Sequence, residues 1–365
     1  MSLPHTETTS AFSYCAFTMK AMKFATMMHR QGYDVRLYAS EVNEAECTEH
    51  IPLITRAEQA EWFPDYNPAR DVWDDFDPSK PHWQAMNERA VAAIRERAEP
   101  GDVFCMTMGL SQQPVALALS DLGLFNVETG IGYTGVWAPF RVFESYAWMA
   151  YLAGKGNDDD VRFYHDVIPN YWDTAEFPLG RGDGGYFLYM GRFIRRKGVE
   201  IAMEATRRLG APLVMAGQGV IDQAPGRFVG IDVVLEGDHL SHVGVVGPEE
   251  RARLMGGAIA VFCPSIYLEP FCGTHVEAML CGTPVITTDW GVFPETVIDD
   301  FTGYRCHTLA EFVQAGRDVE SLDRGSIREH ARATWGLEPV GRRYDRFFRR
   351  LQTLNGAGWY EREVA

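Results

Sequence analysis

The chain has 365 residues, and because one hydrophobic core rarely serves more than about 250 to 300 residues, we expect two domains. With 46% hydrophobic and 23% charged residues, the composition excludes a disordered, collagenous or fibrous protein. Lys and Arg number 34 against 50 Asp and Glu, and the resulting net charge of −16 disfavours nonspecific binding to nucleic acid or anionic membrane, so any anionic ligand requires a local cluster of positive charge.

The amino-terminal half shows a somewhat irregular α/β pattern. In chain order, it predicts a helix over 20–30, a strand over 35–38, a helix over 87–98 and a strand over 103–106. Gly32 ends the first helix and Pro100-Gly101 ends the second. Only three residues precede the turn sequence Pro4-His5-Thr6-Glu7-Thr8-Thr9, so a strand before that turn must be very short or missing.

The carboxy-terminal half alternates short apolar runs with helical patterns, which is typical of a parallel sheet with crossover helices. Strands are predicted over 186–190, 213–216, 258–263 and 284–287, and helices over 199–209, 249–255, 274–280 and 309–315. The pattern therefore predicts a doubly wound α/β domain. Pro- and Gly-rich residues 169–185 mark the boundary between the halves, where a hinge would leave a ligand-binding cleft.

The last predicted helix has an apolar stripe with spacing i, i+3, i+4 and i+7, formed by Tyr344, Phe347, Phe348 and Leu351. Arginines surround the stripe, so the helix could lie on anionic lipid or pack within the protein. We favour intramolecular packing because the stripe is short and the chain is acidic.

The compartment follows from what the chain lacks. No stretch reaches the roughly 18 apolar residues of a membrane span, and residues 1–10 have no signal-peptide pattern. The seven cysteines form no C-x-x-C pair, which argues against a disulfide framework and a zinc site. We therefore expect a cytoplasmic protein without stable membrane insertion, bound metal or cofactor.

A first candidate site follows the strand over 186–190, in the sequence Gly191-Arg192-Phe193-Ile194-Arg195-Arg196-Lys197-Gly198. Gly191 allows a sharp exit from the strand, and Arg192 and Lys197 can then face a cleft beside a helix amino terminus. Two cations and backbone amides suit a diphosphate. The alternative is a basic turn that faces solvent.

A second candidate site follows the strand over 258–263, in Glu269-Pro270-Phe271-Cys272-Gly273-Thr274-His275-Val276-Glu277. Backbone amides of the turn can bind phosphate, and the two carboxylates can accept hydrogen bonds from sugar hydroxyls. Thr274 and Glu277 also fit a capping box, so Glu277 could simply cap the helix. Glu269 has no such role.

Taken in order, G-R-x-x-x-x-K-G, A-G-x-G, E-x7-E and C-G-T-P-V-I resemble the retaining GT-B glycosyltransferases of family 4, over residues 186–303. The resemblance implies an α/β fold of two Rossmann-like, doubly wound domains that face a central cleft. Residues 1–170 would form the acceptor-side domain and residues 171–340 the nucleotide-sugar-binding domain. The helix within residues 341–365 would cross back and pack on the first domain.

The resemblance also implies roles for individual residues. Arg192 and Lys197 would hold the donor diphosphate, Glu269 would contact the donor sugar, and Glu277 would bind the ribose hydroxyls. Family members usually have glycine at the position of Cys272. The implied donor-binding residues are Gly191, Gly217, Phe271, Cys272, Gly273, Thr274 and Glu277.

Acceptor contacts are expected from the first domain. In the family, the loop after the first strand approaches the donor phosphate and the acceptor. His5, Thr6 and Lys20 could instead be surface turn residues. The Gly-rich segment 128–133 and a following helix that contains Glu144 would line the cleft, or simply connect core elements. The aromatic and acidic stretch 62–83 suits sugar binding or an ordinary packed insertion. The acceptor-side candidates are His5, Thr6, Lys20, Gly130, Gly132, Tyr133 and Glu144.

The predicted reaction is transfer of a sugar from a nucleotide diphosphate-sugar to an acceptor hydroxyl, with retention of the anomeric configuration and without a metal ion. UDP- and GDP-sugars are the favoured donors. A glycan and a small metabolite are the favoured acceptors, and the negative charge disfavours a modified nucleobase. Alternatives are a sugar-nucleotide epimerase or phosphorylase of the same fold, or a nucleotide-sugar-binding module without catalysis. The sequence does not predict the oligomeric state.

Overall fold

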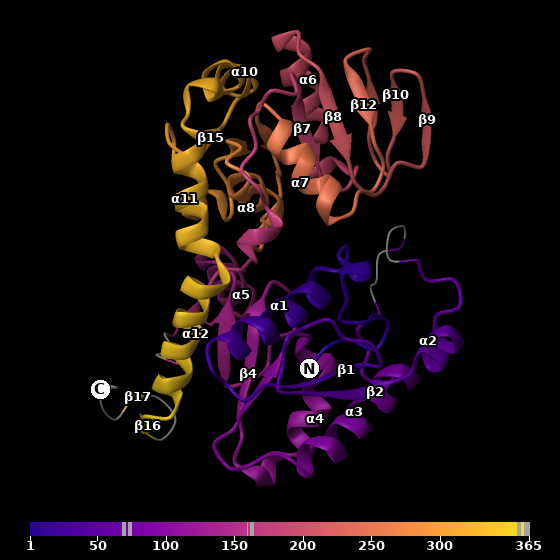
Figure 1. Cartoon of the computed structure of the whole chain (residues 1–365), viewed down its shortest axis with the longest axis vertical. Helices are drawn as coiled ribbons and strands as arrows, with labels where there is room; N and C mark the ends of the chain where they lie inside the picture. Colours follow the sequence, from indigo (N-terminus) through magenta and orange to yellow (C-terminus); the bar gives the residue numbers. More distant parts are fainter. Residues whose placement is uncertain (68–70, 72–74, 159, 161–163, 356–358, 361–365) are drawn as a thin grey trace. The chain divides into compact units, whose positions relative to one another are not determined.

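The computed structural model describes the chain except residues 68–70, 72–74, 159, 161–163, 356–358 and 361–365. The chain forms two compact units (Figure 1). Unit 1 combines Met1–Tyr171 with Leu337–Ala365, and unit 2 is the continuous segment Trp172–Gly336. Where the chain enters and leaves unit 2, Trp172 N donates a hydrogen bond to Trp335 O at 2.9 Å. The two ends of unit 2 therefore lie beside each other.

Unit 1 is an α/β unit with parallel strands. Its strands are β1 (Arg36–Ser40), β2 (Glu49–Ile54), β3 (Val103–Met106), β4 (Phe125–Ile131), β5 (Phe140–Phe143) and β6 (Asp166–Val167), with a terminal pair β16 (Leu354–Asn355) and β17 (Trp359–Tyr360). Its α-helices are α1 (Ala16–Arg30), α2 (Arg56–Trp62), α3 (Pro81–Arg95), α4 (Gln113–Ala118), α5 (Tyr146–Gly156) and α12 (Leu337–Leu351). The order β3-β4-β5-β6 forms one parallel sheet, and β1 pairs with β2 in another.

Residues 1–3 follow an extended path between strands but form no named strand. Ser2 N donates to Tyr38 O of β1 at 2.9 Å, and Met1 N donates to Cys105 O of β3 at 3.2 Å. Leu3 is buried in the core beside these strands. The segment thus supplies backbone partners to both sheets without regular pairing.

Helix α12 is the last element that completes the core of unit 1. Its apolar stripe is buried, and the Tyr344 ring lies edge-on to Phe24 of α1 with 4.9 Å between ring centroids. Burial of four large apolar side chains contributes several kcal/mol to this packing. The helix expected within residues 341–365 spans Leu337–Leu351, and its stripe is not exposed to solvent.

Unit 2 contains a six-stranded parallel sheet in the order β12-β8-β7-β13-β14-β15. Its strands are β7 (Phe187–Met190), β8 (Leu213–Ala216), β12 (Leu240–His242), β13 (Val261–Cys263), β14 (Val285–Thr288) and β15 (Gly303–Cys306). Its helices are α6 (Val199–Leu209), α7 (Pro248–Gly257), α8 (Gly273–Leu280), α9 (Phe293–Thr296), α10 (Leu309–Asp318) and α11 (Arg324–Trp335).

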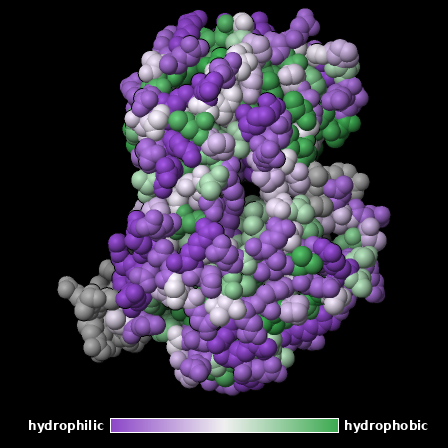
Figure 2. Space-filling view, in the orientation of Figure 1, coloured by the Kyte–Doolittle hydropathy of each residue, from purple (hydrophilic) through white to green (hydrophobic). Residues whose placement is uncertain are grey.

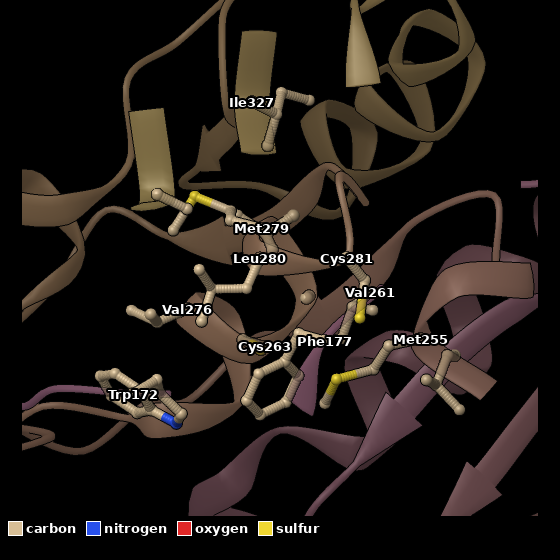
Figure 3. Close-up of a cluster of buried hydrophobic side chains, with 14 of the residues drawn as sticks. Trp172, Phe177, Met255, Val261, Cys263, Val276, Met279, Leu280, Cys281 and Ile327 are labelled. Carbon is tan, nitrogen blue, oxygen red and sulfur yellow. The ribbon is translucent and has the colours of Figure 1, made fainter. Parts of the chain in front are cut away.

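Both faces of this sheet are covered, because successive side chains of a strand point to opposite faces. In β13, Val261 belongs to a core cluster with α8 and α11, whereas Phe262 belongs to a cluster with α6 and α10. Figure 3 shows the first cluster, where Val276, Met279 and Leu280 of α8 lie near Ile327 of α11. The carboxyl ends of the strands are left as the accessible edge.

Several predicted boundaries need correction. The strand predicted over 258–263 begins only at Val261, because Ala258 is the C-cap of α7, whose helix extends beyond the predicted 249–255. The helix predicted over 20–30 begins at Ala16, and that predicted over 87–98 spans Pro81–Arg95. A small antiparallel sheet of β9 (Asp222–Ala224), β10 (Arg227–Val229) and β11 (Val234–Glu236) was not predicted.

One face of the surface is mainly hydrophilic. On the face shown in Figure 2, hydrophilic residues dominate and hydrophobic residues form small separate patches. Among the described residues, no helix has both the length and the apolar character needed to span a membrane. Within the same residues, no three or more His, Cys, Asp and Glu side chains are grouped as a metal site would require.

Helix α10 begins with a capping box, which gives a first testable prediction. Thr308 Oγ1 accepts a hydrogen bond from Glu311 N at 3.3 Å, and Glu311 Oε2 accepts one from Thr308 N at 3.2 Å. We expect Thr308→Ala to destabilise this end of the helix by about 1 kcal/mol, seen as faster hydrogen exchange of the first-turn amides. Thr308→Ser keeps the hydroxyl and should exchange like the wild type; equal exchange in the Ala and Ser variants would contradict the cap.

Candidate functional site

Neighbouring strands β7 and β13 bring the two sequence-predicted motifs of unit 2 together. Lys197 lies in the turn after β7, and Glu269 lies in the loop after β13. Lys197 Nζ lies 2.6 Å from Glu269 Oε1 as a hydrogen-bonded ion pair. A cation and a carboxylate from separate motifs therefore share one position at the carboxyl edge of the sheet.

Glu269 is buried and accepts hydrogen bonds from three side chains. Besides Lys197, Ser265 Oγ donates to Oε1 at 2.6 Å and Tyr267 Oη donates to Oε2 at 2.5 Å. Burial would raise the pKa of Glu269, but the Lys197 charge and these hydrogen bonds outweigh it and hold the pKa below its ordinary value. Burial likewise opposes the charge on Lys197, yet Glu269 raises the Lys197 pKa. Both groups are ionised at neutral pH.

Gly191 and Arg192 follow the end of β7, and Gly217 follows the end of β8. Arg192 is exposed to solvent, and its carbonyl oxygen accepts a hydrogen bond from Tyr189 Oη at 2.8 Å. Gly217, at φ +136°, packs against Gly191: a Cβ at Gly217 would lie 2.2 Å from Gly191 O. Glycine at 217 thus lets the backbone after β8 approach the backbone after β7 closely. Arg192, next to Gly191, is exposed to solvent.

The turn from Phe271 to Thr274 opens helix α8. Cys272 is the N-cap and has φ +64° and ψ +72°, a left-handed conformation that favours glycine. Phe271 is buried and stacks on Trp172, while Thr274 Oγ1 donates to Met190 O of β7 at 3.4 Å. The amino terminus of α8 therefore lies near the end of β7, where amides can meet an anion.

Cys272 also has a thiol partner at the end of β13. A hydrogen bond from the Cys263 thiol lowers the pKa of Cys272. Its own carbonyl oxygen interacts with His275 Nδ1 at 2.5 Å. These contacts hold a cysteine in a left-handed backbone conformation that favours glycine.

Glu277 does not cap α8, so the capping-box interpretation is wrong. The helix begins at Gly273, and no side chain caps its amino terminus. Instead, Glu277 Oε1 accepts hydrogen bonds from Trp172 Nε1 and Arg251 Nη1, each at 3.2 Å. The carboxylate is held from two sides and is free to accept further donors through its remaining lone pairs.

In unit 1, the structure brings four acceptor-side candidates together. Lys20, on α1, donates hydrogen bonds to Glu144 and, at 2.6 Å, to Gly130 O at the end of β4. A Cβ at Gly132 would lie 2.7 Å from Glu144 Oε2. Glu144 lies after β5 rather than in a helix, because Ser145 caps α5 and the helix begins at Tyr146.

Two further candidates from the same list have hydrogen-bond partners outside that ion pair. Tyr133 Oη donates to Glu128 Oε1 at 3.2 Å. Thr6 Oγ1 lies 2.6 Å from Thr18 Oγ1 of α1. Residues 128–131 end β4 and are not the loop that the sequence suggested.

His5 is buried against aromatic side chains, so the interpretation of His5, Thr6 and Lys20 as surface turn residues is wrong. The His5 ring lies edge-on to Phe63 and Tyr66, with centroid distances of 6.2 and 5.3 Å. Burial lowers the pKa of His5 to about 3, with a further contribution from His82. The aromatic and acidic stretch thus packs on the first turn, although residues 68–70 and 72–74 lie outside the described residues.

Several partners of the two carboxylates, Glu269 and Glu277, were not predicted from the sequence. Ser265 and Tyr267 lie four and two residues before Glu269 in the loop after β13. Their closeness in the sequence, together with their hydroxyl groups, is the one signal that could have pointed to them as Glu269 partners. Trp172 and Arg251 have no comparable signal, because they reach Glu277 from distant parts of the chain.

Comparisons with known proteins bear on this arrangement. The family model of glycosyl transferases group 1 matches residues 173–328, which lie within unit 2. A glycogen synthase of Mycobacterium tuberculosis is 35% identical over 177 residues, covering 43% of this chain and 37% of that protein. An alpha-maltose-1-phosphate synthase of the same organism is 28% identical over 216 residues, covering 52% of this chain and 54% of that protein. The chain thus matches less than two thirds of the length of these relatives.

Solved structures match nearly the whole chain. AviGT4, a glycosyltransferase of avilamycin A biosynthesis, has a TM-score of 0.61 at 20% identity and covers 93% of this chain and 90% of its own. Anabaena HepE, solved in complex with UDP and glucose, has a TM-score of 0.61 at 13% identity and covers 91% of this chain and 96% of its own. These similarities confirm the expected GT-B fold.

Proposed function

We propose that the protein is a retaining glycosyltransferase that uses a nucleotide diphosphate-sugar donor, because residues 173–328 match the family model of glycosyl transferases group 1. The observation that carries the proposal is the Lys197–Glu269 pair at the carboxyl edge of β7 and β13, beside the amino terminus of α8. In this position, a cation, a carboxylate and backbone amides can meet the diphosphate and the sugar of one donor.

The proposed donor site uses the residues of unit 2. Arg192 and Lys197 bind the diphosphate, Glu269 accepts hydrogen bonds from the sugar, and Glu277 accepts them from the ribose. Lys197 has three N–H donors, so it can keep its bond to Glu269 while donating to a phosphate oxygen. UDP is the first nucleotide to test because HepE was solved with UDP and with UDP-glucose, and GDP is the second.

In the proposed reaction, the bond between the anomeric carbon and the β-phosphate oxygen breaks while the acceptor oxygen forms a new bond on the same face. The acceptor hydroxyl gives its proton to the departing diphosphate. Negative charge builds on the β-phosphate, where Arg192, Lys197 and the α8 amides stabilise it. This arrangement supplies the positive charge without a metal ion or cofactor.

The acceptor is proposed to bind in unit 1, near the Lys20–Glu144 pair and the turn that contains His5 and Thr6. The buried Lys20 holds Glu144 through an ion pair, and the Lys20 and Glu144 side chains pack directly against Gly130 and Gly132. Tyr133 follows β4 and donates a hydrogen bond to Glu128 of that strand. A glycan or small metabolite fits this polar site better than a nucleobase, given the net charge of −16.

The donor is identified by measuring thermal stability with UDP- and GDP-sugars, since a bound ligand raises the melting temperature with its concentration. Turnover of the stabilising donor is then measured with and without acceptors. An epimerase would convert the donor without acceptor, a phosphorylase would show pyridoxal-phosphate absorbance, and a binding module would release no nucleotide. Release of the nucleotide, together with formation of a glycoside that keeps the anomeric configuration of the donor, supports the proposal.

Arg192 gives the direct test of diphosphate binding. We expect Arg192→Ala to lower kcat/KM about a hundredfold, because the variant lacks one of the charged hydrogen-bond donors that stabilise the negative charge developing on the β-phosphate. Arg195→Ala is the matched control: Arg195 lies exposed in the same segment, 3.6 Å from Glu200. Full activity of both Arg192→Ala and Glu269→Ala would contradict the proposed function.

A further inference from the structure

We infer that Tyr267 is a positioning residue that holds Glu269 and Lys197 in the arrangement needed for sugar transfer. This inference rests on the proposed function. Tyr267 belongs to neither sequence motif, yet its side chain contacts residues of both. It sets the geometry of the site without touching the reacting atoms.

The first contact orients the carboxylate. Lys197 Nζ and Ser265 Oγ both occupy Oε1 of Glu269, each at 2.6 Å, whereas Tyr267 Oη donates to Oε2 at 2.5 Å. Partners on both oxygens fix the plane of the carboxylate. Without Tyr267, Oε1 would keep its two partners, but the position of Oε2 would be less firmly fixed. A sugar hydroxyl that binds this carboxylate therefore meets a direction that Tyr267 helps to set.

The second contact involves the face of the ring. The Arg196 guanidinium carbon lies 3.9 Å from the centroid of the Tyr267 ring, and Lys197 Nζ lies 5.2 Å from it. Both distances allow cation–π attraction. A backbone hydrogen bond from Ile266 N to Arg196 O at 3.0 Å joins the same two segments. Tyr267 thus connects the cationic turn after β7 to the loop after β13.

The hydroxyl of Tyr267 keeps its proton over the working range of the enzyme. Burial, followed by the charge of Glu269, raises the pKa of Tyr267 to about 12. Tyr267 therefore donates a hydrogen bond to an ionised carboxylate. Phenylalanine would keep the ring contact with the cations but lose this bond, which separates the two contributions by mutation.

Two substitutions test the inference. We expect Tyr267→Phe to lower kcat about tenfold, from loss of a charged hydrogen bond, while the affinity for free UDP or GDP changes less than about twofold. Tyr267→Leu also removes the ring, so it should lower kcat at least as much and weaken diphosphate binding about fivefold. Affinities are measured by calorimetry and kcat with saturating donor.

Tyr186→Phe is the matched control, because it removes a tyrosine hydrogen bond of the same unit, to Leu254 O at 2.9 Å, away from this site. It should keep wild-type kcat and nucleotide affinity. Recovery of diphosphate binding in Tyr267→Phe relative to Tyr267→Leu supports positioning by the ring. Wild-type kcat in Tyr267→Phe would overturn the inference, as would equal loss of kcat in the Tyr186→Phe control.

Failure of the positioning role of Tyr267 is distinguishable from failure of the proposed function. A wild-type protein that transfers sugar from no donor contradicts the proposed function itself. In that case, unchanged diphosphate affinity in Tyr267→Leu would overturn the positioning role as well, and a fivefold loss would support the contact of the ring with the cations. An active wild type with an unaffected Tyr267→Phe variant contradicts the inference alone.

Discussion

Replacement of Glu269 by alanine is expected to lower kcat/KM at least about a thousandfold, the largest effect of any single change. The variant loses the carboxylate proposed to bind the donor sugar. It also leaves Lys197, whose side chain is only 20% exposed, without its charged partner. An unpaired buried charge costs about 3 kcal/mol, so the melting temperature should fall too. Transfer rates and thermal unfolding are both measured.

A double variant separates activity from stability. Glu269→Ala combined with Lys197→Met removes both charges and should recover much of the lost stability, because the apolar methionine no longer needs a partner. Activity should remain lost, because the double variant lacks both residues proposed to bind the donor. If the double variant recovers transfer together with stability, the effect of Glu269→Ala is structural and neither Glu269 nor Lys197 has a role toward the donor.

Unit 1 is expected to lose stability in acid because of His5. The folded pKa is about 3 and the unfolded value about 6.5, so the unfolded chain takes up a proton between these values while the folded chain does not. The free energy of unfolding should therefore fall by about 1.4 kcal/mol per pH unit from this residue as pH decreases from 6.5 to 3, and level off below.

The contribution is measured as a difference between variants, because many carboxylates titrate in the same range. His5→Phe keeps the edge-on packing against Phe63 and Tyr66 but cannot take up a proton. Its unfolding free energy, from urea titrations between pH 7 and 4, should depend less on pH than that of the wild type. His307→Gln, at an exposed histidine, is the control. Parallel pH dependence of His5→Phe and wild type would contradict the assigned burial effect.

The fold of unit 2 was largely predictable because its elements have clear periodicity and clear ends. Helix α6 and strand β8 match the predicted residues, since Gly210 stops an amphipathic helix and a short apolar run follows. The strands β9 to β11 have only three residues each, and all residues of β9 are exposed, so they lack an apolar pattern. In unit 1, Cys15 provides no side-chain cap to mark the start of α1.

The candidate site was predictable in its motifs but not in its partners. The spacing of Lys197 and Glu269 places each after a strand, and parallel strands bring such ends together. The contact of Trp172 with Glu277 joins residues 105 positions apart, so it depends on tertiary packing. The turn with His5 and Thr6 contains polar residues that usually lie at the surface, and only the packed structure shows them buried.

The continuity of unit 2 has a consequence for the order in which the protein can fold during synthesis. Residues 172–336 leave the ribosome as one uninterrupted segment whose ends meet at the Trp172–Trp335 hydrogen bond, so this unit can close as soon as α11 is made. Unit 1 begins earlier but needs α12 to cover Phe24 and its neighbours. The half that is translated first is therefore completed last, and its apolar surface on α1 stays uncovered while the whole of unit 2 is synthesised.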